Sequence, residues 1–202
     1  MEDITSIDAL RALYDQPKGR ALKKVLPALE EHSRHFIASS PFVLISTYNS
    51  DGKMDVSPRG GGPGFVEILN NSTLLIPDYK GNNRLDSLTN IIETGRIGTV
   101  FLIPGIDETL GINGSAKLSA SPSLLAHFTQ EFKVPTSCIV VEIEEVFLHC
   151  AKALMRSQLW NANAKINSED FPTMGKMLND QIGNSGVPES RTEMIERYKK
   201  DL

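Results

Sequence analysis

The stretch that decides the fold runs from Phe42 to Pro77 and reads FVLISTYNSDGKMDVSPRGGGPGFVEILNNSTLLIP. Short segments rich in β-branched and aromatic residues alternate in it with turn residues such as Asn49–Gly52. This spacing predicts four strands joined by tight turns, at residues 42–48, 53–57, 65–69 and 73–77. Strands that follow one another this closely indicate an antiparallel meander.

Three more strand patterns follow, at residues 96–103, 109–119 and 138–148. In the last of these, Ile139, Val141 and Ile143 share one face, but Val146 and Leu148 fall out of phase with them. A β-bulge near residues 144–145 would restore the alternation, because a bulge adds one residue to a strand.

Helical patterns surround the strands. Apolar residues recur at helical spacing between Leu22 and Leu29, and Pro27 is suited to the first turn of a helix. A second pattern spans Asn83 to Ile92, with Asn82 or Asn83 as its N-cap, and a third spans residues 122–132. Seven strands with helices before, between and after them predict a mainly β, α+β fold, a closed or split antiparallel β-barrel.

Length and composition predict one globular domain over residues 1–202, in three parts: a helical extension at 1–40, a barrel at 41–149 and a helical region at 150–202. The net charge of −4 argues against a nucleic-acid partner, which requires a basic face. No apolar run approaches the roughly 20 residues of a membrane span. The acidic start lacks the features of a signal peptide. We therefore expect a cytoplasmic protein in which Cys138 and Cys150 are free thiols.

Several familiar motifs are excluded. The glycines of Gly60–Gly64 lead into another strand, whereas a dinucleotide-binding loop leads into a helix. His32 and His35 could share a helix face, but no carboxylate or cysteine pattern completes a zinc site, so no metal site is predicted. His149 and Cys150 are neighbours on an extended strand and point to opposite faces, which argues against a cysteine nucleophile. No catalytic residue is identified.

Two arginines lie at the ends of predicted elements. Arg59 ends a strand before the glycine cluster, and Arg84 lies at the start of a helix. A helix N-terminus favours an anion, and guanidinium groups bind phosphate in a bidentate manner, so the pair is suited to a phosphate. The alternative for each arginine is an exposed, solvated side chain.

A third cluster lies in the segment HCAKALMRSQLW, at His149–Trp160. On a helix, His149, Lys152, Arg156 and Trp160 would share one face, which would suit a charged planar ligand. The alternative is an ordinary surface helix in which Trp160 is a packing anchor.

These segments resemble the pyridoxamine 5′-phosphate oxidase-like flavoproteins, and within them a bacterial FMN-dependent subgroup. The resemblance covers roughly residues 30 to 165. It rests on SPRGGGPGFV at Ser57–Val66, LLIPDYKGNNRLDSLTNI at Leu74–Ile91, FLIPG at Phe101–Gly105, ING at Ile112–Gly114 and the segment at His149–Trp160.

The resemblance implies a split β-barrel that forms a homodimer, with one FMN in each of two clefts at the interface. It implies cofactor-binding roles for Asp55, Val56, Ser57, Arg59, Ile76, Pro77, Asn83, Arg84, Thr109, Arg156, Ser157 and Trp160. In this set, Arg59, Asn83 and Arg84 hold the phosphate, and the backbone at Ile76 and Pro77 meets the flavin ring. Thr109, Arg156, Ser157 and Trp160 reach the FMN of the other subunit.

The function implied is an FMN-dependent oxidoreductase that acts on a small-molecule substrate. The alternatives are a flavin- or heme-binding module without turnover, and a deazaflavin-dependent reductase. Many relatives carry arginine where this chain has Gly111, and the C-terminal arginine–histidine motif of true pyridoxamine phosphate oxidases is missing. Both departures argue against oxidation of vitamin B6 phosphates.

Overall fold

The computed structural model describes residues 3–128 and 133–200. Within these ranges seven strands form one antiparallel sheet in the order β2-β1-β5-β6-β7-β4-β3. The strands are β1 (Phe42–Tyr48), β2 (Met54–Gly60), β3 (Glu67–Asn70), β4 (Thr73–Asp78), β5 (Arg96–Leu102), β6 (Thr109–Ser119) and β7 (Ser137–His149). Each strand predicted from the sequence is confirmed, with ends shifted by a few residues.

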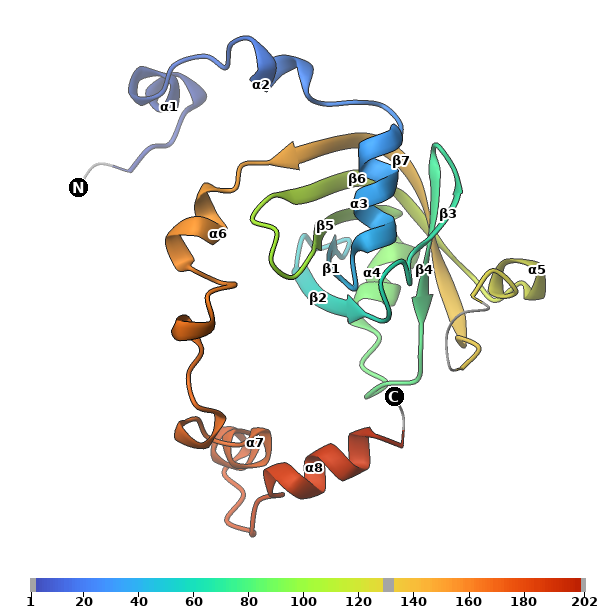
Figure 1. Ribbon diagram of the computed structural model, residues 1–202, viewed down its shortest axis with the longest axis vertical. Helices are drawn as coiled ribbons and strands as arrows, with labels where there is room; N and C mark the ends of the chain where they lie inside the picture. The colour runs from blue at the N-terminus through green and yellow to red at the C-terminus, as the bar shows by residue number, and fades with distance from the viewer. Residues whose placement is uncertain (1–2, 129–132, 201–202) are drawn as a thin grey trace.

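The order of the strands differs from a simple meander. β2 and β3 are consecutive in the chain, yet they lie at opposite edges of the sheet. Only residues 61–66 join them, and six residues span at most about 20 Å. The sheet must therefore curl until its two edges approach each other, and Figure 1 shows the strands curved in this way. The prediction that β2 and β3 pair directly is wrong, whereas the predicted split barrel is confirmed.

The barrel interior forms one hydrophobic core. The inward side chains of β1 and β5 alternate with outward ones, so that Val43, Ile45 and Phe101 are buried. Helix α3 (Glu31–Ser39) adds Phe36 and Ile37 to this core, and helix α4 (Asp86–Thr94) adds other apolar residues from its own buried face. A capping box between Glu30 and Ser33 fixes the start of α3.

The N-terminal segment is less helical than predicted. Between residue 3 and β1, the helices besides α3 are the short α1 (Ile7–Leu13) and α2 (Arg20–Lys23). Leu26 forms a two-way backbone bridge with Val146 of β7, at N···O distances of 2.9 and 2.8 Å. The helical reading of residues 22–29 is confirmed only at the end of α2 and is wrong beyond it, because pairing with the end of β7 outweighs the local pattern there.

The predicted bulge in β7 is confirmed. Asn113 pairs with Glu145 and Gly114 pairs with Ile143, so that Glu144 is the extra residue. Val146 thereby returns to the buried face. Glu144 instead turns outward and forms a two-pronged ion pair with Arg96, with N···O distances of 2.7 and 2.8 Å.

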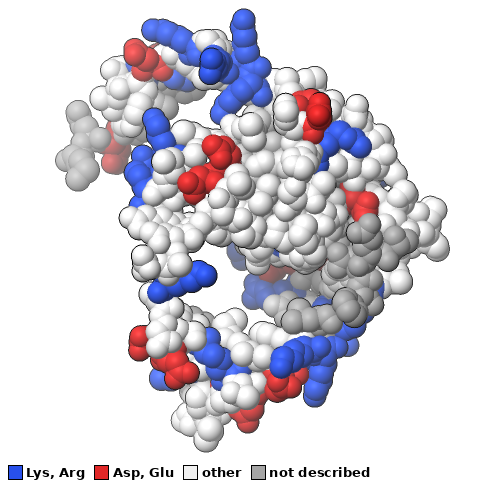
Figure 2. Space-filling model, viewed as in Figure 1, with Lys and Arg blue, Asp and Glu red and all other residues white. Residues whose placement is uncertain are grey.

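Beyond β7 the chain leaves the barrel as an extended arm. We define the arm as residues 150–200; it holds α6 (Lys152–Ser157), the short 3-10 turns Ala162–Ala164 and Ser168–Asp170, α7 (Met174–Ile182) and α8 (Arg191–Tyr198). None of these helices buries a residue. Figure 1 shows the arm curving around one side of the barrel, and an open gap separates the two in Figure 2. Figure 2 shows basic side chains on both sides of this gap.

The remaining helix is short. α5 (Pro122–Leu125) begins where predicted, and part of the predicted span lies outside the described residues. Its flank covers a small second core around Phe128, Cys138 and Val140. No helix among residues 3–128 and 133–200 is long and apolar enough to cross a membrane. The division of the chain at residues 40 and 149 stays a prediction.

Gly114, beside the bulge, cannot accept a side chain. A Cβ atom there would lie 2.0 Å from the carbonyl oxygen of Glu142, inside the pairing of β6 with β7. We expect Gly114→Ala to lower the free energy of unfolding by about 2–4 kcal/mol, because either strand must shift. Urea denaturation measures the change. Gly62→Ala is the matched control, since a Cβ there meets no atom within 4 Å; equal stability of the two variants would contradict this account of the bulge.

Candidate functional site

The main candidate site is a cleft of about 520 Å³ at the open edge of the barrel. Its walls come from the inner face of β2, the end of β4, and residues 79–88, which lead from β4 into α4. A volume of this size is in the range of small-molecule sites. The lining residues are Asp55, Ser57, Pro58, Arg59, Gly60, Phe65, Pro77, Asp78, Tyr79, Gly81, Asn82, Asn83, Arg84, Leu85, Asp86, Ser87 and Leu88.

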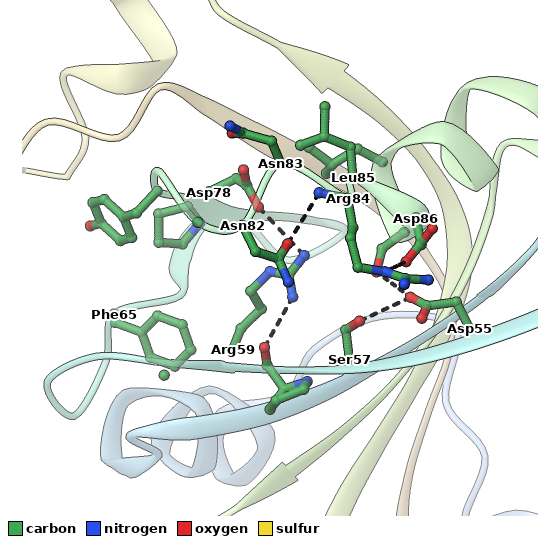
Figure 3. A pocket seen from close by; sticks show the side chains of 17 residues that line it. Asp55, Ser57, Arg59, Phe65, Asp78, Asn82, Asn83, Arg84, Leu85 and Asp86 are labelled. Atoms are coloured by element: carbon green, nitrogen blue, oxygen red, sulfur yellow. Dashed lines mark hydrogen bonds and ion pairs between the residues drawn. The ribbon is translucent and has the colours of Figure 1, made fainter. Parts of the chain in front are cut away.

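The alternation of β2 decides which of its residues face the cleft. Asp55, Ser57 and Arg59 are half-buried, whereas Met54 and Val56, which precede Asp55 and Ser57, point outward and are largely exposed. In Figure 3 the side chain of Arg59 rises from β2 toward Asp78 and the loop that carries Asn82. The predicted residues Asp55, Ser57 and Arg59 are thus brought together in the cleft, and Val56 is not.

Arg59 is the central charge of the cleft. Its Nη2 lies 3.4 Å from Oδ1 of Asp78, and the two side chains are 22% and 15% exposed. Nη1 donates to the carbonyl oxygen of Pro58 at 3.0 Å. The Nε atom is buried and has no hydrogen-bond partner. A buried N–H group without an acceptor is costly, so this guanidinium retains capacity for an acceptor from a ligand.

Arg84 lies at the mouth of the same cleft. Its Nε donates to Asp86 at 2.8 Å, and its side chain is 74% exposed. This hydrogen bond raises the pKa of Arg84. The pair is a surface ion pair of little strength, so Asp86 does not fix Arg84 in place.

The start of α4 differs from the prediction. The helix begins at Asp86, after Leu85, and no side chain caps it. Asn83 and Leu85 both have left-handed backbone conformations, with φ of 60° and 58°. The Asn82 side chain accepts from the N–H of Arg84 at 3.1 Å, ahead of the helix. The predicted N-cap is therefore wrong, and the first turn of α4 opens into the cleft without a capping side chain.

A hydrogen-bond network ties α4 to β2 below the arginines. Oδ2 of Asp55 accepts from the hydroxyl of Ser57 at 2.9 Å and also from the hydroxyl of Ser87 (Figure 3). Ser87 is buried in the first turn of α4. This network holds the start of α4 against β2.

Of the remaining predicted residues, Pro77 and Asn83 line the cleft, and the others lie apart from it within one chain. The side chain of Ile76 is fully buried in the core, whereas Pro77 lines the cleft. Thr109 and Arg156 line a second depression of about 620 Å³ where the arm leaves the barrel, together with Val100, His149, Cys150, Lys152, Ala153 and Leu154. Ser157 ends α6 beside it.

The predicted common helix face of residues 149–160 is wrong. His149 belongs to β7, and its ring meets that of Phe147 edge-on at 4.9 Å. α6 ends at Ser157 because Gln158 has a left-handed conformation. The indole N–H of Trp160 donates to the carbonyl oxygen of Ile106 at 2.8 Å, so Trp160 anchors the arm to the barrel. This agrees with the packing alternative.

Other candidate chemistry is not supported by the structure. Among the described residues, no group of three or more His, Cys, Asp or Glu side chains is placed to hold a metal ion. His32 and His35 are exposed on α3. Cys138 and Cys150 are free thiols, and burial raises the pKa of Cys138.

The sequence prediction missed several residues that line the cleft, and Asp78 is the one that contacts Arg59. It lies directly after the predicted strand 73–77, at an edge where strand ends gather. A carboxylate at the end of a strand could have marked Asp78 as a candidate site residue. Its partner, however, is Arg59, which lies 19 positions earlier in the chain. Only the curl of the sheet brings the two together.

Comparison with known proteins agrees with this fold. No curated protein matches the chain in sequence. The structure of HupZ from Group A Streptococcus is similar, with a TM-score of 0.50 and 13% identity, over 59% of this chain and 93% of that one. A putative pyridoxamine 5′-phosphate oxidase from Lactobacillus delbrueckii has a TM-score of 0.46 and 18% identity, over 60% and 95% of the two chains. HutZ, the heme storage protein from Vibrio cholerae, has a TM-score of 0.42 and 12% identity, over 60% of this chain and 93% of that one.

The family assignment rests on the sequence itself. A family described as pyridoxamine 5′-phosphate oxidase matches residues 29–150. The match includes all seven strands, α3 and α4, and every residue that lines the cleft. The chain therefore belongs to the pyridoxamine 5′-phosphate oxidase-like family.

Proposed function

We propose that the cleft binds FMN and that the protein is an FMN-dependent oxidoreductase. The observation that carries the proposal is the guanidinium of Arg59, which has a buried Nε–H without an acceptor, and whose ion pair to Asp78 is long, at 3.4 Å. A phosphate oxygen at this point would satisfy the free donor and give Arg59 a charge-assisted hydrogen bond.

The start of α4 supports the same position for the phosphate. The first N–H groups of a helix have no partners within the helix, and the helix dipole adds a partial positive charge. In α4 no side chain takes up these donors. Arg84, close by and held only by a surface pair, is free to turn toward an anion. Asn83 lies on the same approach to the helix.

The other wall of the cleft is suited to a flat ring. Pro77 and Phe65 present apolar surface, and Leu85 and Leu88 add to it from the approach to α4 and its first turn. When bound, the flavin supplies the redox chemistry, so the protein has to bind it, orient it and tune its surroundings. Asp55, Ser57 and Ser87 hold the two sides of the cleft at a fixed distance for this task.

We further propose that the protein acts as a homodimer with FMN at the interface. One cleft carries two arginines against the carboxylates of Asp55, Asp78 and Asp86, so an incoming phosphate needs additional positive charge. The second depression, with Thr109 at its base, supplies His149, Lys152 and Arg156, and none of its lining residues is acidic. Docking this depression of one copy on the cleft of the other would place Thr109, Arg156, Ser157 and Trp160 beside the cofactor.

The arm supports a dimer on separate grounds. Met174, Leu178 and Ile182 follow one another along α7 at helical spacing, and all three are 45% or more exposed. An amphipathic helix gains most of its stability from burying its apolar face. A second copy is the partner that would cover these residues.

Heme and deazaflavin are the competing ligands. The residues that line the cleft include no His, Cys or Met, so Tyr79 would be the only side chain there of a kind that ligates heme iron. A deazaflavin with a phosphate would use the same anion site, and the mass of the released cofactor separates it from FMN.

The first prediction concerns the phosphate anchor. The purified protein is expected to be yellow, with a flavin absorption band. Arg59→Ala is expected to weaken FMN binding by about ten- to a hundredfold. Arg84→Ala is expected to weaken it by about three- to tenfold. Arg59 has the larger effect because it is half-buried, whereas Arg84 is exposed. Fluorescence titration of the flavin-free variants with FMN measures both affinities.

Two controls accompany this titration. Riboflavin lacks the phosphate, so its affinity should change little in either variant. Arg20→Ala removes an exposed arginine of α2 that does not line the cleft and should bind FMN like the wild type. Full FMN affinity in both Arg59→Ala and Arg84→Ala would show that the phosphate lies elsewhere.

The second prediction concerns the dimer. Light scattering should give twice the chain mass of 22.2 kDa. Arg156→Ala should weaken FMN binding several-fold without splitting the dimer, because the side chain would neutralise charge at the other subunit's cleft. Lys165→Ala, on an exposed part of the arm, is the control. A monomer that binds FMN in full would contradict the shared site.

A further inference from the structure

A carboxylate occupies the place where an anionic ligand has to bind. Asp78 ends β4, and its side chain is only 15% exposed, 3.4 Å from the guanidinium of Arg59. The backbone cannot easily carry it away: Asp78 pairs with Ser137 of β7, and its carbonyl oxygen accepts from the N–H of Thr136 at 3.0 Å. Asp78 therefore stays beside whatever binds Arg59.

The surroundings of Asp78 are unevenly charged. The titratable groups that line the cleft with it are Asp55 and Arg59 from β2, Tyr79 from the following loop, Arg84 ahead of α4 and Asp86 at the first position of α4. β7, which pairs with β4, carries the thiol of Cys138, but this thiol packs in the small second core with Leu75 and Val140.

Arg59 is the one cation of this group that acts directly on Asp78. Burial raises the pKa of the Asp78 carboxyl above its ordinary value, and the attraction of Arg59 offsets this only in part. The carboxylate is thus already closer to taking up a proton than a solvated aspartate would be.

We propose that Asp78 is the internal counter-ion of Arg59 in the empty cleft and that it takes up one proton when the phosphate of the ligand binds. This inference rests on the proposed function, because it requires an anionic ligand at Arg59. The proton comes from solvent and adds to a carboxylate oxygen, so that no other bond forms or breaks.

We expect this proton uptake because of the balance of charge around the guanidinium of Arg59. Arg59 and Asp78 cancel each other before binding. A phosphate of charge near −2 beside them would leave two negative groups at one cation in a partly desolvated site. A neutral carboxyl removes that repulsion and can donate its O–H to a phosphate oxygen, whereas a carboxylate can only accept.

Proton uptake makes the affinity for FMN depend on pH. A ligand whose binding takes up a proton binds more weakly as pH rises, over the window between the pKa of Asp78 in the empty cleft and its higher pKa in the filled one. The slope in that window is at most about tenfold in affinity per pH unit for one proton. FMN itself titrates near pH 6, so the dependence has to be judged against a variant that lacks Asp78.

The test uses the full-length, flavin-free protein and isothermal titration calorimetry. FMN is titrated at one pH in two buffers with different heats of ionisation, which gives the number of protons taken up. We expect the wild type to take up more protons than Asp78→Asn, by as much as one. Riboflavin should show no such difference. At the upper end of the pH window, Asp78→Asn should bind FMN about tenfold more tightly for each unit by which the ligand raises the pKa of Asp78.

A matched variant separates this role from a general charge effect. Asp86→Asn removes the same charge from the cleft lining, at the exposed pair with Arg84. On binding FMN, Asp86→Asn should take up as many protons as the wild type. The asparagine in Asp78→Asn keeps the size of the side chain, and a thermal melt verifies folding.

The outcomes are distinguishable. Equal proton uptake by the wild type and Asp78→Asn, with FMN still bound by both, overturns the role of Asp78 and leaves the proposed function intact. Equal loss of uptake in Asp78→Asn and Asp86→Asn also overturns it, since the effect would be one of net charge. Failure of the wild type to bind FMN at any pH overturns both proposals.

Discussion

The structure depends on the short link between β2 and β3. Because residues 61–66 join strands at opposite edges of a seven-stranded sheet, the sheet has to curl, and its open seam lies between β2 and the β3–β4 hairpin. The ion pair of Arg59 with Asp78 crosses this seam. One topological constraint thus creates the barrel, its cleft and the charge pair inside the cleft.

Much of this fold could be predicted from local sequence patterns. The strands are long enough and their alternation regular enough to be recognised, and the phase change in β7 located the bulge at Glu144. Arg59 and Arg84 were identified because each lies at the end of an element. These features depend on neighbours in the chain, which is why the sequence reveals them.

The sequence predictions are wrong where the local structure is determined by contacts between residues far apart in the chain, or by unusual backbone conformations. Leu26 pairs with Val146 instead of continuing a helix, and the order of strands in the sheet has no local signature. Leu85 and Gln158 adopt left-handed conformations without being glycine, so the start of α4 and the end of α6 were misplaced. Asp78 was missed because its partner comes from another strand.

We expect the phosphate of a flavin to bind at the seam, beside Arg59 and the start of α4. The most direct measurement is the crystal structure of the purified protein with its natural cofactor. The account predicts an FMN phosphate oxygen within hydrogen-bond distance of Nε of Arg59, close to the first turn of α4. A flavin whose phosphate lies away from Arg59, or a cofactor without a phosphate, would contradict it.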